Sequence, residues 1–324
     1  MLKTFKNRST KKGYQYLLLK ALGFLMLAFI FDFIIGGIFN YFYFKQTSGW
    51  EYRTKYSIED TKADILIFGA SRAQQQYNPV FFEERLNQTC YNVGRDGEPF
   101  FYSYAILKGV LNRYAPKIVI LDIENMVFKE SQNSYDRLAV LLPFYKKHPE
   151  LRSIIELRSA FEKLKLQSRI YPYNSLLFKI AMGNTEFNKK RNEDIKGYLP
   201  LTGALDEPIR AVELSKKRYA IDSNKVNFFK MFINDCGKAN IKLFIVCSPY
   251  FIHSNGMDTS VVIAKEIAKE RNIDFIDFSK DETFLTNSRL FDDTVHVNFT
   301  GSELFSNKLI DTIMIKNKKL GPIN

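Results

Sequence analysis

The sequence predicts a three-layer α/β/α domain with a parallel sheet, preceded by a single N-terminal transmembrane helix. Near the start lies an apolar run of 24 residues, 21–44. Further on come five short runs of apolar and β-branched residues, each followed by a segment with apolar residues at three-to-four spacing. Near-continuous apolar runs are typical of strands buried on both faces of a parallel sheet, and their alternation with helices indicates an α/β fold.

The composition is that of a chain that can bury a large core. Hydrophobic residues make up 46% of the 324 positions and aromatic residues 15%, which excludes intrinsic disorder for most of the chain. Three cysteines are too few for a disulfide scaffold of this length. They fall in strand and helix patterns, so we expect buried structural thiols: Cys90, Cys236 and Cys247.

The apolar run 21–44 is long enough to span a bilayer, because as a helix it reaches about 36 Å and a hydrocarbon core is about 30 Å thick. The tail 1–20 holds six basic residues and no acid, half of the net charge of +12. This bias places the N-terminus in the cytoplasm and everything after Lys45 outside. No small-x-small cleavage site is evident, which favours an uncleaved anchor in the cell (inner) membrane over a signal peptide. This topology excludes nucleic acid as a partner.

Asp32 is the one charged residue in this span. A carboxylate near the middle of a bilayer is costly, and two interpretations stay open. Asp32 is either a contact with a polar membrane partner, or an acid tolerated at a bilayer defect or a point of self-association.

The rest of the chain divides by pattern. Residues 45–62 are polar and mixed, as in a tether, and 63–315 form the α/β domain, followed by a C-terminal tail at 316–324. Residues 129–215 break the alternation, so we expect an insertion that caps the sheet edge. Strands are predicted at 63–68, 89–93, 117–123, 241–247 and 273–278, and helices at 79–86, 101–114, 224–239, 261–271 and 302–315.

Ligands of open α/β sheets bind beyond the carboxyl ends of the strands, so the residues that follow each strand carry the functional prediction. Ser71 follows the first strand, and a serine hydroxyl needs a base to become a nucleophile. His148 stands in a solvated loop and His253 follows the fourth strand. His296 comes three residues after Asp293, a spacing that lets the carboxylate hold the imidazole in one tautomer.

Backbone N–H groups at Ser71 and in the turn at Gly94 are candidate donors to a developing oxyanion. Metal chemistry is not expected, since no His-Glu-x-x-His, paired-Cys motif or dense carboxylate cluster occurs. No glycine-rich nucleotide loop follows the first strand either, so no cofactor is expected.

Three blocks of the sequence resemble the SGNH (GDSL-like) hydrolase superfamily. Gly69-Ala70-Ser71 is similar to its Gly-x-Ser turn, Gly94 to its oxyanion glycine, and the Asp293-to-His296 spacing to its Asp-x-x-His block. The resemblance covers about residues 63–123 and 241–315. It implies a flavodoxin-like (SGNH-like) domain, with Ser71 as nucleophile, His296 as base and Asp293 as the residue that orients it.

Two positions depart from the family pattern. Ala70 stands where an Asp is usual, and the third block, Gly-x-Asn-Asp, is replaced by residues 122–125, of which Asn125 is a candidate oxyanion amide. The chain is more similar to a divergent membrane-anchored branch that moves acyl groups onto or off cell-envelope polymers. Arg72 and Arg95 are candidate substrate contacts, with support of the sheet surface as the alternative for Arg72.

The resemblance therefore implies a membrane-anchored serine esterase or O-acyltransferase that acts on acyl esters, with acetyl as the expected group, of an exported or cell-envelope glycan. A polytopic acyltransferase is a further candidate partner. The alternative is a non-catalytic SGNH-like scaffold that binds such an acyltransferase or a glycan. A third interpretation is a sensor or assembly factor in which the anchor is the important part.

Overall fold

A computed structural model describes residues 2–185, 194–205, 218–251 and 257–318. Five parallel strands form one sheet in the order β2-β1-β3-β4-β5, the order of a flavodoxin-like doubly wound sheet. Each strand lies inside one of the five predicted runs, which confirms the predicted α/β fold. The strands are β1 (Ile65–Phe68), β2 (Cys90–Asn92), β3 (Ile118–Asp122), β4 (Lys242–Cys247) and β5 (Asp274–Asp277).

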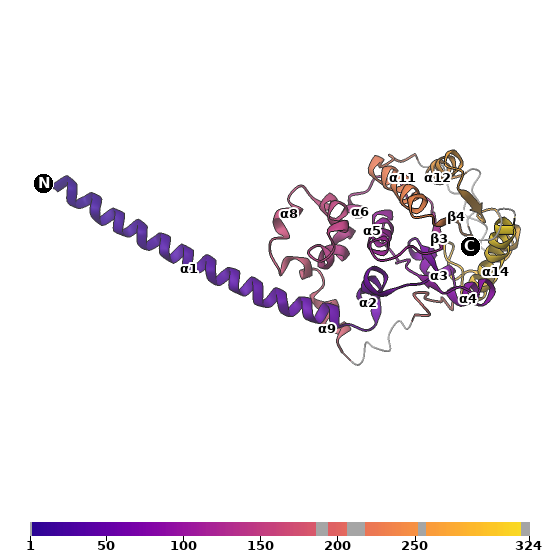
Figure 1. Cartoon of the computed structure of the whole chain (residues 1–324), viewed down its shortest axis with the longest axis horizontal. Helices are drawn as coiled ribbons and strands as arrows, with labels where there is room; N and C mark the ends of the chain where they lie inside the picture. The colour runs from indigo at the N-terminus through magenta and orange to yellow at the C-terminus, as the bar shows by residue number, and fades with distance from the viewer. Residues whose placement is uncertain (1, 186–193, 206–217, 252–256, 319–324) are drawn as a thin grey trace.

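Side chains of each strand alternate between two hydrophobic cores, one on each face of the sheet. Leu66 and Phe68 of β1 belong to one core, and Ile65 and Ile67 belong to the other. Helices cover both faces, which gives the three layers visible in Figure 1. The first face carries α5 (Phe100–Leu111), α11 (Ser223–Lys238) and α12 (Thr259–Glu270); the second carries α3 (Ser71–Gln76), α4 (Pro79–Leu86), α13 (Glu282–Leu285) and α14 (Phe299–Lys318).

Side-chain caps fix where several of these helices begin. Asn78 accepts a hydrogen bond from the Val80 amide at the start of α4, where Pro79 also favours a first turn. Aspartates cap three more helices in the same way: Asp222 on α11, Asp258 on α12 and Asp281 on α13. These local signals explain why the predicted and observed helix starts lie close together.

The N-terminal helix, α1 (Leu2–Lys45), is one long apolar helix whose apolar part covers Gly13–Lys45, with a mean hydropathy of 2.4 in its most apolar stretch. It projects from one end of the body, and its last part lies against α9 (Leu177–Gly183) (Figure 1). Asp32 accepts hydrogen bonds from the amides of Arg169 (2.7 Å) and Ile170 (3.2 Å). The partner of Asp32 is thus a segment of the same chain, which neither sequence-based interpretation foresaw.

The predicted tether at 45–62 is folded, which corrects the prediction. It forms α2 (Gly49–Lys55) and the π-helix η1 (Tyr56–Asp60), both packed toward α5. The polar residues read as solvated have partners inside the body. Thr54 is fully buried and shares a hydrogen bond with the Tyr102 hydroxyl (3.0 Å). Arg113 donates to the carbonyl oxygens of Ile58 (2.7 Å) and Thr61 (2.9 Å).

The insertion between β3 and β4 packs on α5 and on α1, and does not simply cap the sheet edge as predicted. Several of its leucines, Leu141 and Leu151 among them, join the core on the α5 side, and His148 is buried between Glu59 (3.0 Å) and Glu150 (2.8 Å), not solvated. Its described elements are α6 (Gln132–Asp136), η2 (Arg137–Phe144), η3 (Pro149–Leu151), α7 (Arg152–Ile155), η4 (Glu156–Arg158), α8 (Glu162–Lys165), η5 (Tyr171–Tyr173) and α9. The predicted tail at 316–324 begins inside α14, and residues 319–324 lie outside the described residues.

The backbone of the insertion lies directly against α1 at Gly36. A Cβ there would lie 2.4 Å from Cβ of Arg169 and 2.5 Å from its carbonyl carbon, whereas a Cβ at Gly37 would meet nothing within 4 Å. Contacts that short do not occur in folded proteins, so the packing requires a glycine at position 36.

We expect Gly36→Ala to loosen the contact between α1 and the insertion, although alanine normally favours a helix by about 1 kcal/mol over glycine. The rate of proteolysis within residues 157–185 of the detergent-solubilised full chain should rise. Gly37→Ala is the matched control and should leave that rate unchanged or lower it. Equal rates for the two variants would contradict the packing described here.

Candidate active site

A sharp turn places Ser71 at the carboxyl edge of the sheet. Strand β1 ends at Phe68 and α3 begins at Ser71, with Gly69 at φ +146° between them. A Cβ at Gly69 would lie 2.7 Å from Cβ of Ala73 and 3.1 Å from Cβ of Asp122, so both the backbone angle and the space require glycine. The turn leaves the Ser71 side chain half-buried at the first position of a helix.

Three side chains form a continuous chain of hydrogen bonds at this edge. Ser71 Oγ lies 2.8 Å from His296 Nε2, and His296 Nδ1 lies 2.8 Å from Asp293 Oδ2. Since an ionised carboxylate only accepts, Nδ1 carries the proton and Nε2 is left to accept from the serine hydroxyl. Residues 225 positions apart therefore meet in the geometry of a serine nucleophile, its base and an orienting carboxylate.

The loop that carries Asp293 and His296 is held by its own backbone and by α3. Asp293 Oδ1 accepts from the amides of Val295 (2.7 Å) and His296 (2.8 Å). Gln76, near the end of the same helix as Ser71, donates from Nε2 to the Val295 carbonyl (2.9 Å). The base is thus fixed relative to the nucleophile by the helix that starts with that nucleophile.

The Asp293 carboxylate is held in its ionised form. Partial burial by itself would raise the pKa of Asp293, but hydrogen bonds from the His296 ring and from the amides of Val295 and His296 lower it to about 2. A carboxylate with this pKa remains negative beside the imidazole throughout the neutral and mildly acidic range.

Beneath the Ser71 turn lies a buried ion pair. Arg72 is 2% exposed, its Nε lies 3.4 Å from Asp122 Oδ2, and its other nitrogens donate to the carbonyls of Ile123 (2.7 Å) and Ser248 (3.3 Å). Burial alone would lower the pKa of Arg72, but the Asp122 carboxylate, acting together with Cys247, Glu124 and Tyr77, raises that pKa. The Tyr77 hydroxyl also donates to Asp122 (2.6 Å). Arg72 therefore ties the turn to β3 and β4, which fits the structural alternative for this residue and not the substrate contact.

Arg95 is likewise a structural residue, contrary to its prediction as a substrate contact. Its guanidinium is buried, with ion pairs to Glu51 (3.4 Å) and Glu98 (3.6 Å). It also donates to the Trp50 carbonyl (3.1 Å) and to the Thr54 hydroxyl. The cause is the folded segment 49–60, which lies where the sequence predicted a loose tether and supplies partners for this cation.

The candidate oxyanion donors are not all in place. The Ser71 amide opens a helix, where the first N–H groups have no intrahelical acceptor. The Gly94 amide already donates to Asn92 Oδ1 (3.0 Å), and the glycine serves close packing, since a Cβ there would lie 2.9 Å from Cβ of Ala73. Asn125 is half-buried in the turn after β3, and its Oδ1 is buried without a hydrogen-bond partner among the described residues.

A cavity of about 220 Å³ opens beside Ser71, and its walls are mostly polar. Burial raises the pKa of Glu124, although Arg72 opposes it, and burial lowers the pKa of Lys225. Arg137 and Asn133 come from the start of the insertion. Its lining residues are Ala70, Ser71, Asp96, Gly97, Glu98, Pro99, Phe100, Glu124, Met126, Val127, Asn133, Ser134, Arg137 and Lys225.

Sequence reasoning missed the residues that support and surround the triad. Asp122 had a signal, because a carboxylate at the end of an apolar strand must find a buried partner. Gln76 is fully buried, although glutamine side chains are usually exposed. Lys225 had no local signal, since it reaches the cavity only through the packing of α11. His253, which follows the fourth predicted strand, lies outside the described residues.

Comparisons with known proteins give distant likenesses only. No protein-family model matches the chain, and no curated protein matches it in sequence. Among solved structures, the chain is similar to an acetyl xylan esterase, AlAXEase, at 16% identity and a TM-score of 0.39, over 77% of this chain and 99% of that one. It is also similar to the psychrotrophic esterase EstA of Pseudoalteromonas sp., at 13% identity and a TM-score of 0.39, over 78% and 98% of the two chains. The case for a function therefore rests on the side chains themselves.

Removing one partner of the buried Arg72–Asp122 pair should strongly destabilise the domain. We expect Asp122→Asn to lower the free energy of unfolding by about 3–5 kcal/mol, because it leaves an uncompensated buried cation. Denaturant unfolding of the detergent-solubilised chain measures this. The control is Arg85→Met, whose pair with Asp311 is exposed and should contribute about 0–1 kcal/mol. Similar losses in the two variants would contradict a special role for the buried pair.

The lowered pKa of Asp293 gives a titration that can be measured directly. A carboxyl with a depressed folded-state pKa contributes stability above its ordinary pKa of about 3.9, and that contribution is lost as the pH falls through the folded value. The Asp293 carboxyl resonance should titrate with a midpoint near 2 in the native chain. In His296→Ala the midpoint should rise, because the ring hydrogen bond is gone. A native midpoint near 3.9 would refute the hydrogen-bonded arrangement.

Proposed function

We propose that this chain is a membrane-anchored, SGNH-like serine esterase or O-acyltransferase. The observation that carries the proposal is the Ser71–His296–Asp293 chain, with heavy-atom distances of 2.8 Å at both hydrogen bonds. A hydroxyl, an imidazole and a carboxylate in this order are the parts needed for acyl transfer through a serine ester.

In the proposed reaction, Ser71 Oγ attacks the carbonyl carbon of an ester while its proton passes to His296 Nε2. Asp293 stabilises the imidazolium that forms, and the Ser71 amide faces the developing oxyanion. The tetrahedral adduct collapses as the leaving alcohol takes the proton from His296, which leaves an acyl-Ser71 ester. Water or a sugar hydroxyl then attacks that ester, with His296 again as base, and Ser71 is released. The acceptor decides between hydrolysis and transfer.

The cavity supports a polar, hydroxyl-rich substrate with a small acyl group. Carboxylate, guanidinium, ammonium and amide groups line it, and such walls suit sugar hydroxyls better than a long acyl chain. We therefore propose acetyl or similarly short esters of a glycan. Asn133 and Arg137 of the insertion line the same cavity, and in this proposal they contact a sugar next to the ester.

The anchoring belongs to the same proposal. The apolar helix is long enough to cross a bilayer, and the basic tail favours a cytoplasmic N-terminus. The domain would then act outside the cell membrane on an envelope or exported polymer, alone or with a polytopic acyltransferase.

One observation favours a second candidate, a non-catalytic scaffold of the same fold. The Gly94 amide donates within the protein, and Asn125 is not among the residues that line the cavity, so the oxyanion side of the site is less complete than its nucleophile side. A scaffold would bind an acyltransferase or a glycan and would have no need of an oxyanion hole.

Labelling with a fluorophosphonate separates the two candidates, because the probe reacts only with an activated serine. We expect the full-length chain to form an adduct at Ser71 and to hydrolyse an aryl acetate. Ser71→Ala should lose the adduct and at least about a thousandfold in rate. Ser288→Ala, a serine on the short helix η6 (Ser288–Leu290), is the control and should keep both. A folded native chain without an adduct would favour the scaffold.

A further inference from the structure

The short helix α8 carries two large apolar side chains on its outer surface. Phe161 is 68% exposed and Leu164 is 70% exposed, although α8 belongs to a folded part of the insertion. The segment that follows α8 is the one bound to Asp32 of α1. Helix α8 lies on the side of the body from which α1 projects (Figure 1).

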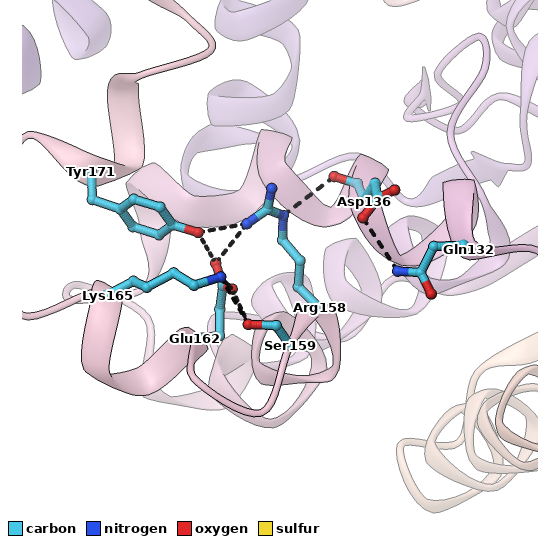
Figure 2. Close-up of polar contacts among 7 residues, drawn as sticks. All are labelled: Gln132, Asp136, Arg158, Ser159, Glu162, Lys165 and Tyr171. Carbon is cyan, nitrogen blue, oxygen red and sulfur yellow. Dashed lines mark hydrogen bonds and ion pairs between the residues drawn. The ribbon is translucent and has the colours of Figure 1, made fainter.

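The buried residue of this segment is polar and its exposed residues are apolar, whereas loops that face water usually show the opposite pattern. Glu162 is fully buried between Phe161 and Leu164. Figure 2 shows its carboxylate surrounded by donors from the neighbouring turns. These donors are Arg158 (2.9 Å), Ser159 (2.9 Å), Lys165 (3.0 Å) and the Tyr171 hydroxyl (2.6 Å).

This arrangement has a physical consequence. A carboxylate with four donors is satisfied without water, and the network fixes the turn of α8 so that Phe161 and Leu164 remain on the outside. Polar groups that are satisfied inside the protein, with apolar groups outside, suit a surface that meets hydrocarbon.

Helix α1 also has apolar side chains exposed in the part that lies beside the insertion. The insertion covers one side of its last part, yet Ile34 and Ile38 stay about half exposed, at 53% and 47%. Apolar side chains on the open side of a membrane helix are expected to contact lipid. Arg169 stacks over the Phe33 ring, 3.7 Å from its centroid, so the insertion follows the helix at the same depth.

The depth can be counted along α1. Lys20 reaches back over the Tyr16 ring (4.5 Å), which lets the ammonium leave the hydrocarbon toward the N-terminal side. From Leu17, a core of about 30 Å takes about 20 residues and ends near Gly36. Asp32 then lies just inside the outer boundary, and residues 41–44 form an aromatic belt in the headgroup region.

We propose that α8 is a second membrane contact of this protein, which inserts Phe161 and Leu164 into the outer leaflet beside α1. This inference rests on the proposed anchoring. The occupant of the surface is lipid, because the segment that follows α8 is hydrogen-bonded to Asp32 of the apolar helix. Lys163 and Arg169 are exposed next to it, where their charged ends can reach anionic headgroups while the stems stay in the apolar layer.

The test places a spin label on the full-length chain in vesicles of phosphatidylethanolamine and phosphatidylglycerol. The labelled variants are Phe161→Cys and, independently, Leu164→Cys. The native cysteines are buried thiols, so the folded native chain serves as the labelling blank. Collision of the label with oxygen, which partitions into lipid, is compared with collision with a water-soluble nickel chelate. We expect an oxygen-to-nickel ratio several times that of Phe299→Cys, an exposed position on α14.

Each other outcome overturns the proposal. A label at 161 and 164 that is as accessible to nickel as the label at 299 would place α8 in water. A label shielded from both reagents would indicate a protein partner in place of lipid. Leu25→Cys, within α1, separates this inference from the anchoring on which it rests. If the label at 25 is in lipid and those at 161 and 164 are in water, only the second contact fails; if all are in water, the anchoring fails too.

Discussion

The buried pair of Arg72 and Asp122 is the interaction on which the site depends. It joins the residue after Ser71 to the end of β3, and through the Ser248 carbonyl to the end of β4. Two charges removed from water are costly unless their remaining hydrogen-bonding groups are satisfied. Here Tyr77 donates to the carboxylate, and two main-chain carbonyls accept from the guanidinium. The turn that carries Ser71 is thus held to the centre of the sheet by the buried guanidinium of Arg72.

From that fixed turn the rest of the site follows in order. Helix α3 begins at Ser71, and Gln76 near its end holds the Val295 carbonyl of the loop that carries His296 and Asp293. The orientation of the imidazole is therefore set from two directions, by the carboxylate on its own loop and by the helix of the serine it faces. A site held in this way needs little rearrangement before an acyl transfer, because the reacting groups already lie at hydrogen-bonding distance.

The sequence was informative where the determinants are local. The apolar runs of the five strands, the Asx caps and the spacing from Asp293 to His296 all act within a few residues, and the predicted sheet and triad residues follow from them. Contacts between distant parts of the chain leave no such pattern. Arg72 meets a carboxylate 50 positions away, and Asp32 meets amides 137 and 138 positions away. Residues 45–62 were predicted to be a tether for the same reason. No pattern within them indicates that Tyr102 and Arg113 are their partners.

Under the proposed function, the folded segment between α1 and β1 determines how far from the membrane the domain can reach its substrate. A catalytic domain that is joined to its membrane anchor by a flexible linker can reach polymer at many distances from the membrane. In this chain the connecting segment is folded into α2 and η1, and close packing at Gly36 and the hydrogen bonds of Asp32 hold α1 against the domain. Under the proposed function, such a body would keep one height and one orientation above the membrane, so a polymer strand would have to pass within reach of Ser71 to be modified.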